Sequence, residues 1–174
     1  PALLPPPTTM ADQRLAAKRI PGTGFLVDGF RFQATPGVTA LFLTHAHSDH
    51  TTGLGRGFGV RPPRGAVVGG GEGTSADAAA PYTPPPLYAS PATAALIIHD
   101  TPRVQPTHVR RLPLGRPVLI ADGPGRAPVC VTALCANHCP GAVVLVFDIP
   151  GREEGAGRGP APPPPGGPAA RPPR

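Results

Sequence analysis

The stretch that decides the interpretation of this chain is FLTHAHSDHTTGL, residues 42–54. Six positions, 45–50, hold three of the chain's six histidines and one of its ten acidic residues. They come directly after VTALFLT, residues 38–44, a nearly continuous apolar run that predicts a buried strand. A chain with few charged residues thus concentrates histidine and aspartate at the end of one strand.

The spacing of these residues suits metal ions. Alternate residues of an extended segment point to the same side, so His45 and His47 can hold one ion between them. Asp49 and His50 come after the chain bends, where they can face a second ion. Imidazole and carboxylate groups are suitable zinc ligands, and a zinc site with an open coordination position is hydrolytic. The H-x-H-x-D-H pattern after a buried strand therefore predicts a zinc centre rather than an accidental cluster.

A third histidine is needed to complete the ligands of the first ion. His138 lies in ANHCPGA, residues 136–142, between two segments rich in β-branched residues. It is therefore expected at a junction of strand and loop, as His45 is. Pro140 and Gly141 make this loop tight. We expect His138 to join the first ion.

The other histidines and the cysteines have no comparable context. His99 and His108 do not follow a predicted buried strand, so we expect both on the surface. A separate zinc site formed by Cys130, Cys135 and Cys139 is an alternative that their spacing makes weak. An odd number of cysteines without a CxxC pair does not make a disulfide framework, which favours a reducing compartment.

Further elements surround this centre. Strand patterns cover residues 24–32, 87–90, 127–135 and 141–149. Residues 91–98 predict a short helix with Pro91 in its first turn, and HSDHTTGL can begin another helix capped by Ser48 or Asp49. Buried strands that alternate with helices indicate an α/β layered sheet.

Composition divides the chain. Its 174 residues include 23 glycines and 29 prolines, a content typical of partly disordered chains. We expect residues 1–17 to be a disordered lead-in with at most a short helical turn at its end, and residues 151–174 to be a disordered tail. A low-complexity insertion is expected over residues 61–86. The folded domain is then residues 18–150.

Charge and hydropathy limit the partners. The net charge of +6 suits a polyanion such as nucleic acid, although arginine-rich tails give the same bias. No run approaches the roughly 20 apolar residues of a membrane helix, and no stretch resembles a signal peptide. We expect a soluble protein without a membrane partner.

Four stretches together resemble a known family. The DNA cross-link repair nucleases contain similar stretches in the same order. In this chain the stretches are KRIPGTGFLVDGF, ALFLTHAHSDHTTGL, LYASPATAALI and ANHCPGAVVLVF. These nucleases are the Artemis and Apollo group of the metallo-β-lactamase superfamily, which carries a β-CASP insertion. The histidine pattern alone is shared with glyoxalases, lactamases and RNA-processing nucleases, whereas ANHCPGA and IPGTGFLVD single out the DNA branch. The resemblance covers residues 18–60 and 87–149, which correspond to the N-terminal part of that domain.

The resemblance implies a fold and a set of site residues. The fold would be the metallo-β-lactamase αββα sandwich, with only its N-terminal half present. Asp28 matches an acidic residue that supports the metal-binding histidines from behind; the alternative is a strand-end aspartate that caps a turn. Asp49 would also accept the proton of the attacking water, and Cys139 would be a packing residue. The zinc ligands would be His45, His47 and His138 for the first ion, and Asp49 and His50 for the second; no other cofactor-binding residue is expected.

The implied function is that of a zinc-dependent DNA nuclease of the 5′ exonuclease type. It would act on DNA in the nucleus, in DNA repair that includes interstrand cross-link repair, and other repair proteins would be its partners. The family also uses a metal-bridging aspartate, a β-CASP region and a further metal-binding histidine, none of which we find in these residues. Asp148 lies within a predicted strand and is not assigned the bridging role. We therefore expect this chain to be inactive by itself, with an apolar face left uncovered.

Two other interpretations remain. The chain can be a non-catalytic truncated module that keeps metal ligands without turnover. It can also be a small-molecule hydrolase of the same superfamily, although the ANHCPGA stretch argues against this.

Overall fold

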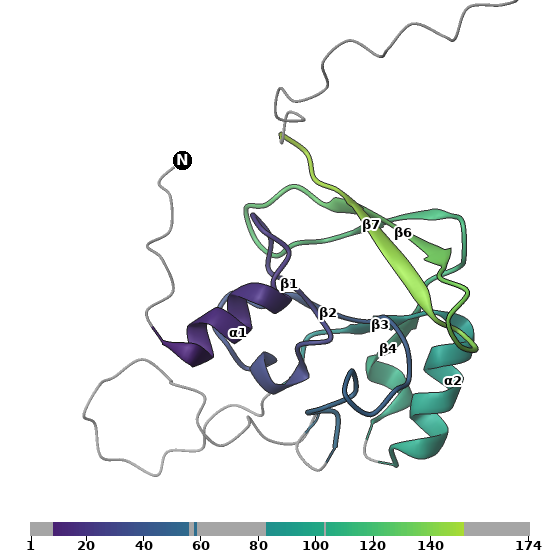
Figure 1. Cartoon of the computed structure of the whole chain (residues 1–174). Helices are drawn as coiled ribbons and strands as arrows, with labels where there is room; N and C mark the ends of the chain where they lie inside the picture. The colour runs from purple at the N-terminus through teal and green to yellow at the C-terminus, as the bar shows by residue number, and fades with distance from the viewer. Residues whose placement is uncertain (1–8, 56–57, 59–82, 103, 152–174) are drawn as a thin grey trace, which may run out of the picture.

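Two β-sheets face each other in the computed structural model (Figure 1), which describes residues 9–55, 58, 83–102 and 104–151. The first sheet is parallel, with the strand order β1-β2-β3-β4. The second is antiparallel, with the order β5-β6-β7. The first sheet consists of β1 (Phe25–Val27), β2 (Ala40–Leu43), β3 (Leu87–Ala89) and β4 (Val109–Arg111). The second consists of β5 (Pro117–Ile120), β6 (Val129–Cys135) and β7 (Val143–Asp148).

Strand β2 is buried on both faces, which explains its continuous apolar sequence. Leu41 and Leu43 pack in a core that includes Ile97 of helix α2 (Pro91–Asp100). Phe42 points the other way, and its ring lies 5.2 Å from that of Phe147 in β7. The order of layers is therefore helix, sheet, sheet, and the predicted α/β class is confirmed. The assignment to the metallo-β-lactamase sandwich stays a prediction.

The second sheet is covered on one face only within the described residues. Val129, Val131 and Ala133 of β6 point into the core between the sheets. The opposite face carries exposed apolar side chains, namely Leu119, Leu134, Val144 and Val146. This agrees with the apolar face that the sequence analysis expects to be uncovered.

Helix α1 (Met10–Lys18) is longer than the short turn expected at the end of a disordered lead-in. A capping box starts it: Thr9 accepts a hydrogen bond from the backbone N–H of Asp12, and Asp12 accepts one from the backbone N–H of Thr9. Leu15 packs against the core. The prediction of disorder is therefore corrected for residues 10–17, while residues 1–8 lie outside the described part.

Two predicted elements are wrong in part. The strand expected over residues 24–32 ends at Val27, because Asp28 has φ +50° and Phe30–Phe32 form a 3-10 turn, η1. The segment that begins at Ser48 forms turns rather than a helix. Strands β4 and β5 and the 3-10 turn η2 (Pro106–His108) were not anticipated.

The remaining element predictions are confirmed. Strands β2, β3, β6 and β7 lie within their predicted ranges, and helix α2 runs two residues further than expected. The predicted insertion and tail fall almost wholly on residues outside the described part. Of the helices that the structure describes, none is long and apolar enough to cross a membrane.

Candidate metal centre

Residues 44–53, the first histidine loop, follow β2 and fold back on η1. The backbone N–H groups of His50 and Thr51 both donate to the carbonyl of His47, which makes a tight turn. Gly53 has φ +104°, and a Cβ atom there would lie 2.6 Å from the backbone nitrogen of Arg31. Only glycine allows this close approach, so the loop is fixed at both ends.

Residues 136–142, the second histidine loop, join β6 to β7 and carry His138. The carbonyl of Gly141 accepts hydrogen bonds from the hydroxyl groups of Ser90 (2.6 Å) and Thr93 (2.9 Å) at the start of α2. The first residue of β7, Val143, directly follows this loop, and its N–H donates to the carbonyl of Thr44 in the first histidine loop at 3.0 Å. These bonds hold His138 beside the end of β2.

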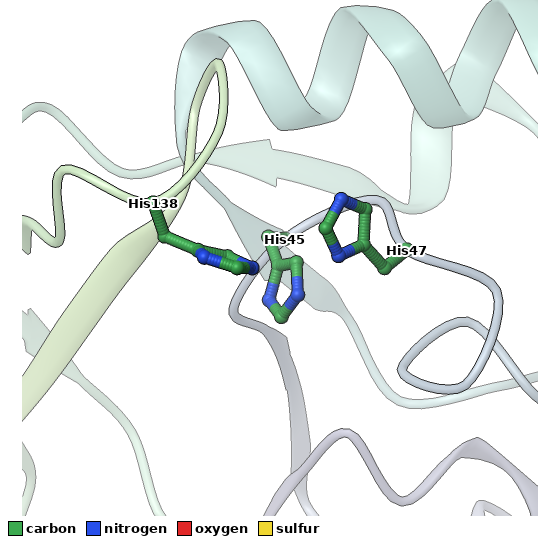
Figure 2. A group of neighbouring side chains, drawn as sticks. All are labelled: His45, His47 and His138. Atoms are coloured by element: carbon green, nitrogen blue, oxygen red, sulfur yellow. The ribbon is translucent and has the colours of Figure 1, made fainter.

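Three imidazoles converge between the two loops (Figure 2). The possible ligand nitrogens of His45, His47 and His138 all lie within 4.8 Å of one another. Their ring centroids are 4.6 to 5.1 Å apart. A tetrahedral zinc ion, with bonds of about 2.0 Å, holds its nitrogens about 3.3 Å apart, so small side-chain rotations would close the set. Three imidazoles around one point therefore fit a metal ion, with one coordination position left open.

Hydrogen bonds behind the rings select the tautomers. The carboxylate of Asp28 lies 2.7 Å from Nδ1 of His50 and accepts hydrogen bonds from the N–H and hydroxyl of Thr44. Because the hydroxyl of Thr44 donates to Asp28, it is left to accept from Nδ1 of His45 at 2.9 Å. Both imidazoles then keep their Nε2 lone pair for a metal.

Asp49 and His50 form a second group beside the three imidazoles. Nε2 of His50 lies 3.4 Å from a carboxylate oxygen of Asp49, whose side chain is 77% exposed. The ring centroid of His50 lies 4.0 Å from that of His45. Among the described residues, neither Asp49 nor His50 joins the tighter cluster of three.

Burial acts on the charge of the centre. His45 is 8% exposed, and this burial lowers its pKa below the ordinary value, with the neighbouring histidines adding to the effect. The neutral form that results is the form that binds metal ions.

The other candidate residues lie apart from the centre. His99 is exposed and pairs with Asp100, as expected. His108 is half-buried instead, with its ring facing Phe58, so the prediction of a surface position is corrected. Asp148 ends β7 at the end remote from the second histidine loop. Among the described residues, the three cysteines form no metal-binding group.

Sequence reasoning missed the residues that hold the second loop. Ser90 and Thr93 are buried and act on Gly141, about 50 residues further along the chain. The one available signal was the helix start, where Ser90 also caps α2 by accepting from the N–H of Thr93. A cap predicts where a helix begins, but not which distant loop it holds.

Several known proteins are similar in sequence to this chain. Over 133 residues, 76% of its length, the chain is 37% identical to the DNA cross-link repair 1A protein of Mus musculus. It is 33% identical over 129 residues, 74% of its length, to the 5′ exonuclease Apollo of Gallus gallus. The chain is a relative of the DNA cross-link repair proteins. This confirms the resemblance to the Artemis and Apollo group.

The relatives are much longer than this chain. It spans 10% of the mouse DNA cross-link repair 1A protein and 21% of the chicken Apollo protein. A DNA cross-link repair protein of Arabidopsis thaliana is 31% identical over 76% of the chain, which spans 21% of it. No family model matches the chain.

Proposed function

We propose that this chain carries the zinc centre of a DNA nuclease of the 5′ exonuclease type, which acts in the nucleus in DNA repair, including interstrand cross-link repair. One observation carries the proposal: His45 and His47 from one loop meet His138 from another, about 90 residues away in sequence. The names of the relatives, a DNA cross-link repair protein and a 5′ exonuclease, support DNA as the substrate.

Each residue of the centre would have a defined task. His45, His47 and His138 would hold the zinc ion, which supplies Lewis acidity for hydrolysis of a phosphodiester. Asp28 keeps His50 in the tautomer that can bind a metal. Asp49 is exposed beside His50, where its carboxylate can accept the proton of the attacking water.

The second ion would have fewer protein ligands than the first. In the described part of the chain, only Asp49 and His50 face that position. Metal sites that persist have three or four protein ligands. We therefore propose that this chain binds one zinc ion tightly and a second weakly, and that it does not cut DNA by itself. In the whole protein, other repair proteins would be its partners.

Zinc content tests the ligand assignment. The 174-residue chain and its His47→Ala and His99→Ala variants are dialysed against zinc-free buffer and analysed by elemental mass spectrometry. Both substituted histidines are exposed, so the variants are matched. We expect His47→Ala to bind zinc at least about tenfold more weakly than the parent chain, and His99→Ala to bind it equally well. Equal zinc content in both variants would overturn the assignment.

Activity separates the three interpretations of the chain. A 5′-phosphorylated strand with a label at its 3′ end is incubated with the zinc-loaded chain. Progressive shortening from the 5′ end that is lost in His47→Ala would support the nuclease and contradict the expected inactivity of this chain alone. Zinc binding without cleavage supports the non-catalytic module. Zinc-dependent hydrolysis of a small ester without cleavage of DNA would instead indicate a small-molecule hydrolase.

A further inference from the structure

A cleft of about 480 Å³ opens beside the metal centre, between helix α1 and the segment that contains η1. In Figure 1, α1 and this segment lie next to each other below β1. Gly29 allows the close approach, since a Cβ atom there would lie 3.1 Å from Cβ of Lys18. Asp49 lines the cleft and also lies beside His50, so the cleft borders the metal centre.

Three cationic side chains line the cleft. Arg14 and Lys18 line it from α1, and Arg31 lines it from η1. Of the ion pairs that the structure describes, none involves these three cations. Asp28 also borders the cleft, but its carboxylate is already bound to Thr44 and His50. The three cations outnumber the two acidic residues of the cleft, Asp28 and Asp49, so the cleft can attract an anion.

The inner surface of the cleft is largely apolar and includes an aromatic ring. Phe32 lines the cleft and is half-buried against the core, so part of its ring is accessible. Sites for single-stranded nucleic acid combine cations that contact phosphates with aromatic rings on which bases stack. The volume lies in the range of about 300–1,000 Å³ that is usual for small-molecule sites, which is large enough for one nucleotide.

We infer that this cleft binds one nucleotide of the DNA strand beside the metal centre. Arg14, Lys18 and Arg31 contact its phosphates, and its base stacks on Phe32. The inference rests on the proposed function, because it places the strand next to Asp49. It adds a binding site for the strand beyond the three histidines of the metal centre.

Binding measured without metal tests the cleft independently of catalysis. The probe is a 5′-phosphorylated, fluorescein-labelled single strand of about ten nucleotides. Its affinity for the full chain is measured by fluorescence anisotropy with a chelator present, at about 50 and about 200 mM salt. The test variant combines Arg14→Gln, Lys18→Gln and Arg31→Gln. Its control is a chain with three Arg→Gln substitutions at exposed sites outside the cleft: Arg110, Arg111 and Arg116.

The cleft variant should bind the strand at least about tenfold more weakly than the control. It should also lower the salt slope by about 1.4, since the two phosphates that flank one nucleotide are no longer neutralised. A Phe32→Leu variant should bind the strand about fivefold or more weakly, because stacking of the base is lost. Its affinity for heparin, a polyanion without bases, should not change. Circular dichroism and zinc content should match the parent chain in both variants.

Three results would overturn the inference. The parent chain can fail to bind the strand, or the cleft variant can bind it as the control does. Phe32→Leu can also leave strand binding unchanged, which would show that the cleft attracts polyanions by charge alone. Zinc content reports separately on the proposed function: a chain that binds the strand in its cleft but holds no zinc at His47 would refute that function and leave the cleft site standing.

Discussion

The two histidine loops are held by different chemistry. A buried carboxylate, that of Asp28, holds the first loop, and it touches the imidazole of His50 directly. A neutral backbone carbonyl, that of Gly141, holds the second loop by accepting from Ser90 and Thr93. Its bonds do not include the imidazole of His138. The first anchor is a charged group in contact with a histidine of the centre. The second anchor is a neutral group whose hydrogen bonds, in the described part of the chain, include no histidine.

This difference separates two requirements of a metal centre. The carboxylate fixes both where His50 lies and which of its nitrogens carries the proton. The carbonyl fixes only where His138 lies. Substitutions at the first anchor should therefore change both metal affinity and the free energy of unfolding strongly. Substitutions at the second anchor should change the free energy of unfolding more than metal affinity.

The largest effect is expected at the second anchor, for Gly141→Ala. Gly141 has φ +82°, and a Cβ atom there would lie 2.6 Å from both the backbone nitrogen and the hydroxyl of Thr93. Backbone strain and overpacking should together lower the free energy of unfolding by about 3–4 kcal/mol. Urea denaturation of the metal-free chain measures this loss.

Gly115→Ala is the matched control for this substitution. Gly115 has a similar φ of +68°, but nothing lies within 4 Å of the Cβ position. It should lose only about 1–2 kcal/mol, from backbone strain. Equal losses in the two variants would show that the second loop is not packed against α2.

Asp28→Asn addresses the first anchor and should have the next largest effect. Asp28 is 5% exposed at its side chain, and asparagine keeps its shape and tolerates its positive φ. Loss of the charged hydrogen bonds should lower the free energy of unfolding by about 2 kcal/mol. The amide can present an N–H to Nδ1 of His50, which would move the imidazole proton to Nε2. The affinity of the second zinc site, at Asp49 and His50, should then fall about tenfold or more, as measured by calorimetric titration.

Asp122→Asn provides a second buried carboxylate for comparison. Asp122 is 2% exposed and accepts hydrogen bonds from the N–H of Gly24 and the hydroxyl of Thr39, away from the histidines. We expect a similar loss of stability with unchanged zinc affinity. If both variants lose zinc equally, the role of Asp28 is only to support the fold.

The sequence predicted the parts of this centre that local patterns encode. A buried strand followed by histidines at alternate positions indicated His45 and His47, and a tight loop between two β-branched strands indicated His138. The structure brings these three together. The apolar periodicity of β2, α2, β6 and β7 was also sufficient to place those elements.

What escaped prediction depends on contacts between distant residues or on backbone conformations without a local signal. The strand at residue 25 was expected to run on to residue 32, because FRF continues its apolar alternation; the positive φ of Asp28 ends it first. The first helix was underestimated because three prolines, Pro5, Pro6 and Pro7, come shortly before its capping box. No spacing rule connects Ser90 to Gly141, since their hydrogen bond is a product of the assembled layers.

Ser90→Ala should have the smallest effect of the three anchor substitutions. Ser90 caps α2 and donates to Gly141, but Thr93 still donates to the same carbonyl when the hydroxyl is removed. We expect a loss of about 1–2 kcal/mol in stability, from the cap and one hydrogen bond.

Thr9→Ala is the matched control, since Thr9 caps α1 without contacting a histidine loop. Only Ser90→Ala should also weaken zinc binding, by less than Asp28→Asn does, because the carbonyl anchor positions His138 without setting its tautomer. A larger fold-loss of zinc affinity, relative to the parent chain, for Ser90→Ala than for Asp28→Asn would reverse the ranking of the two anchors.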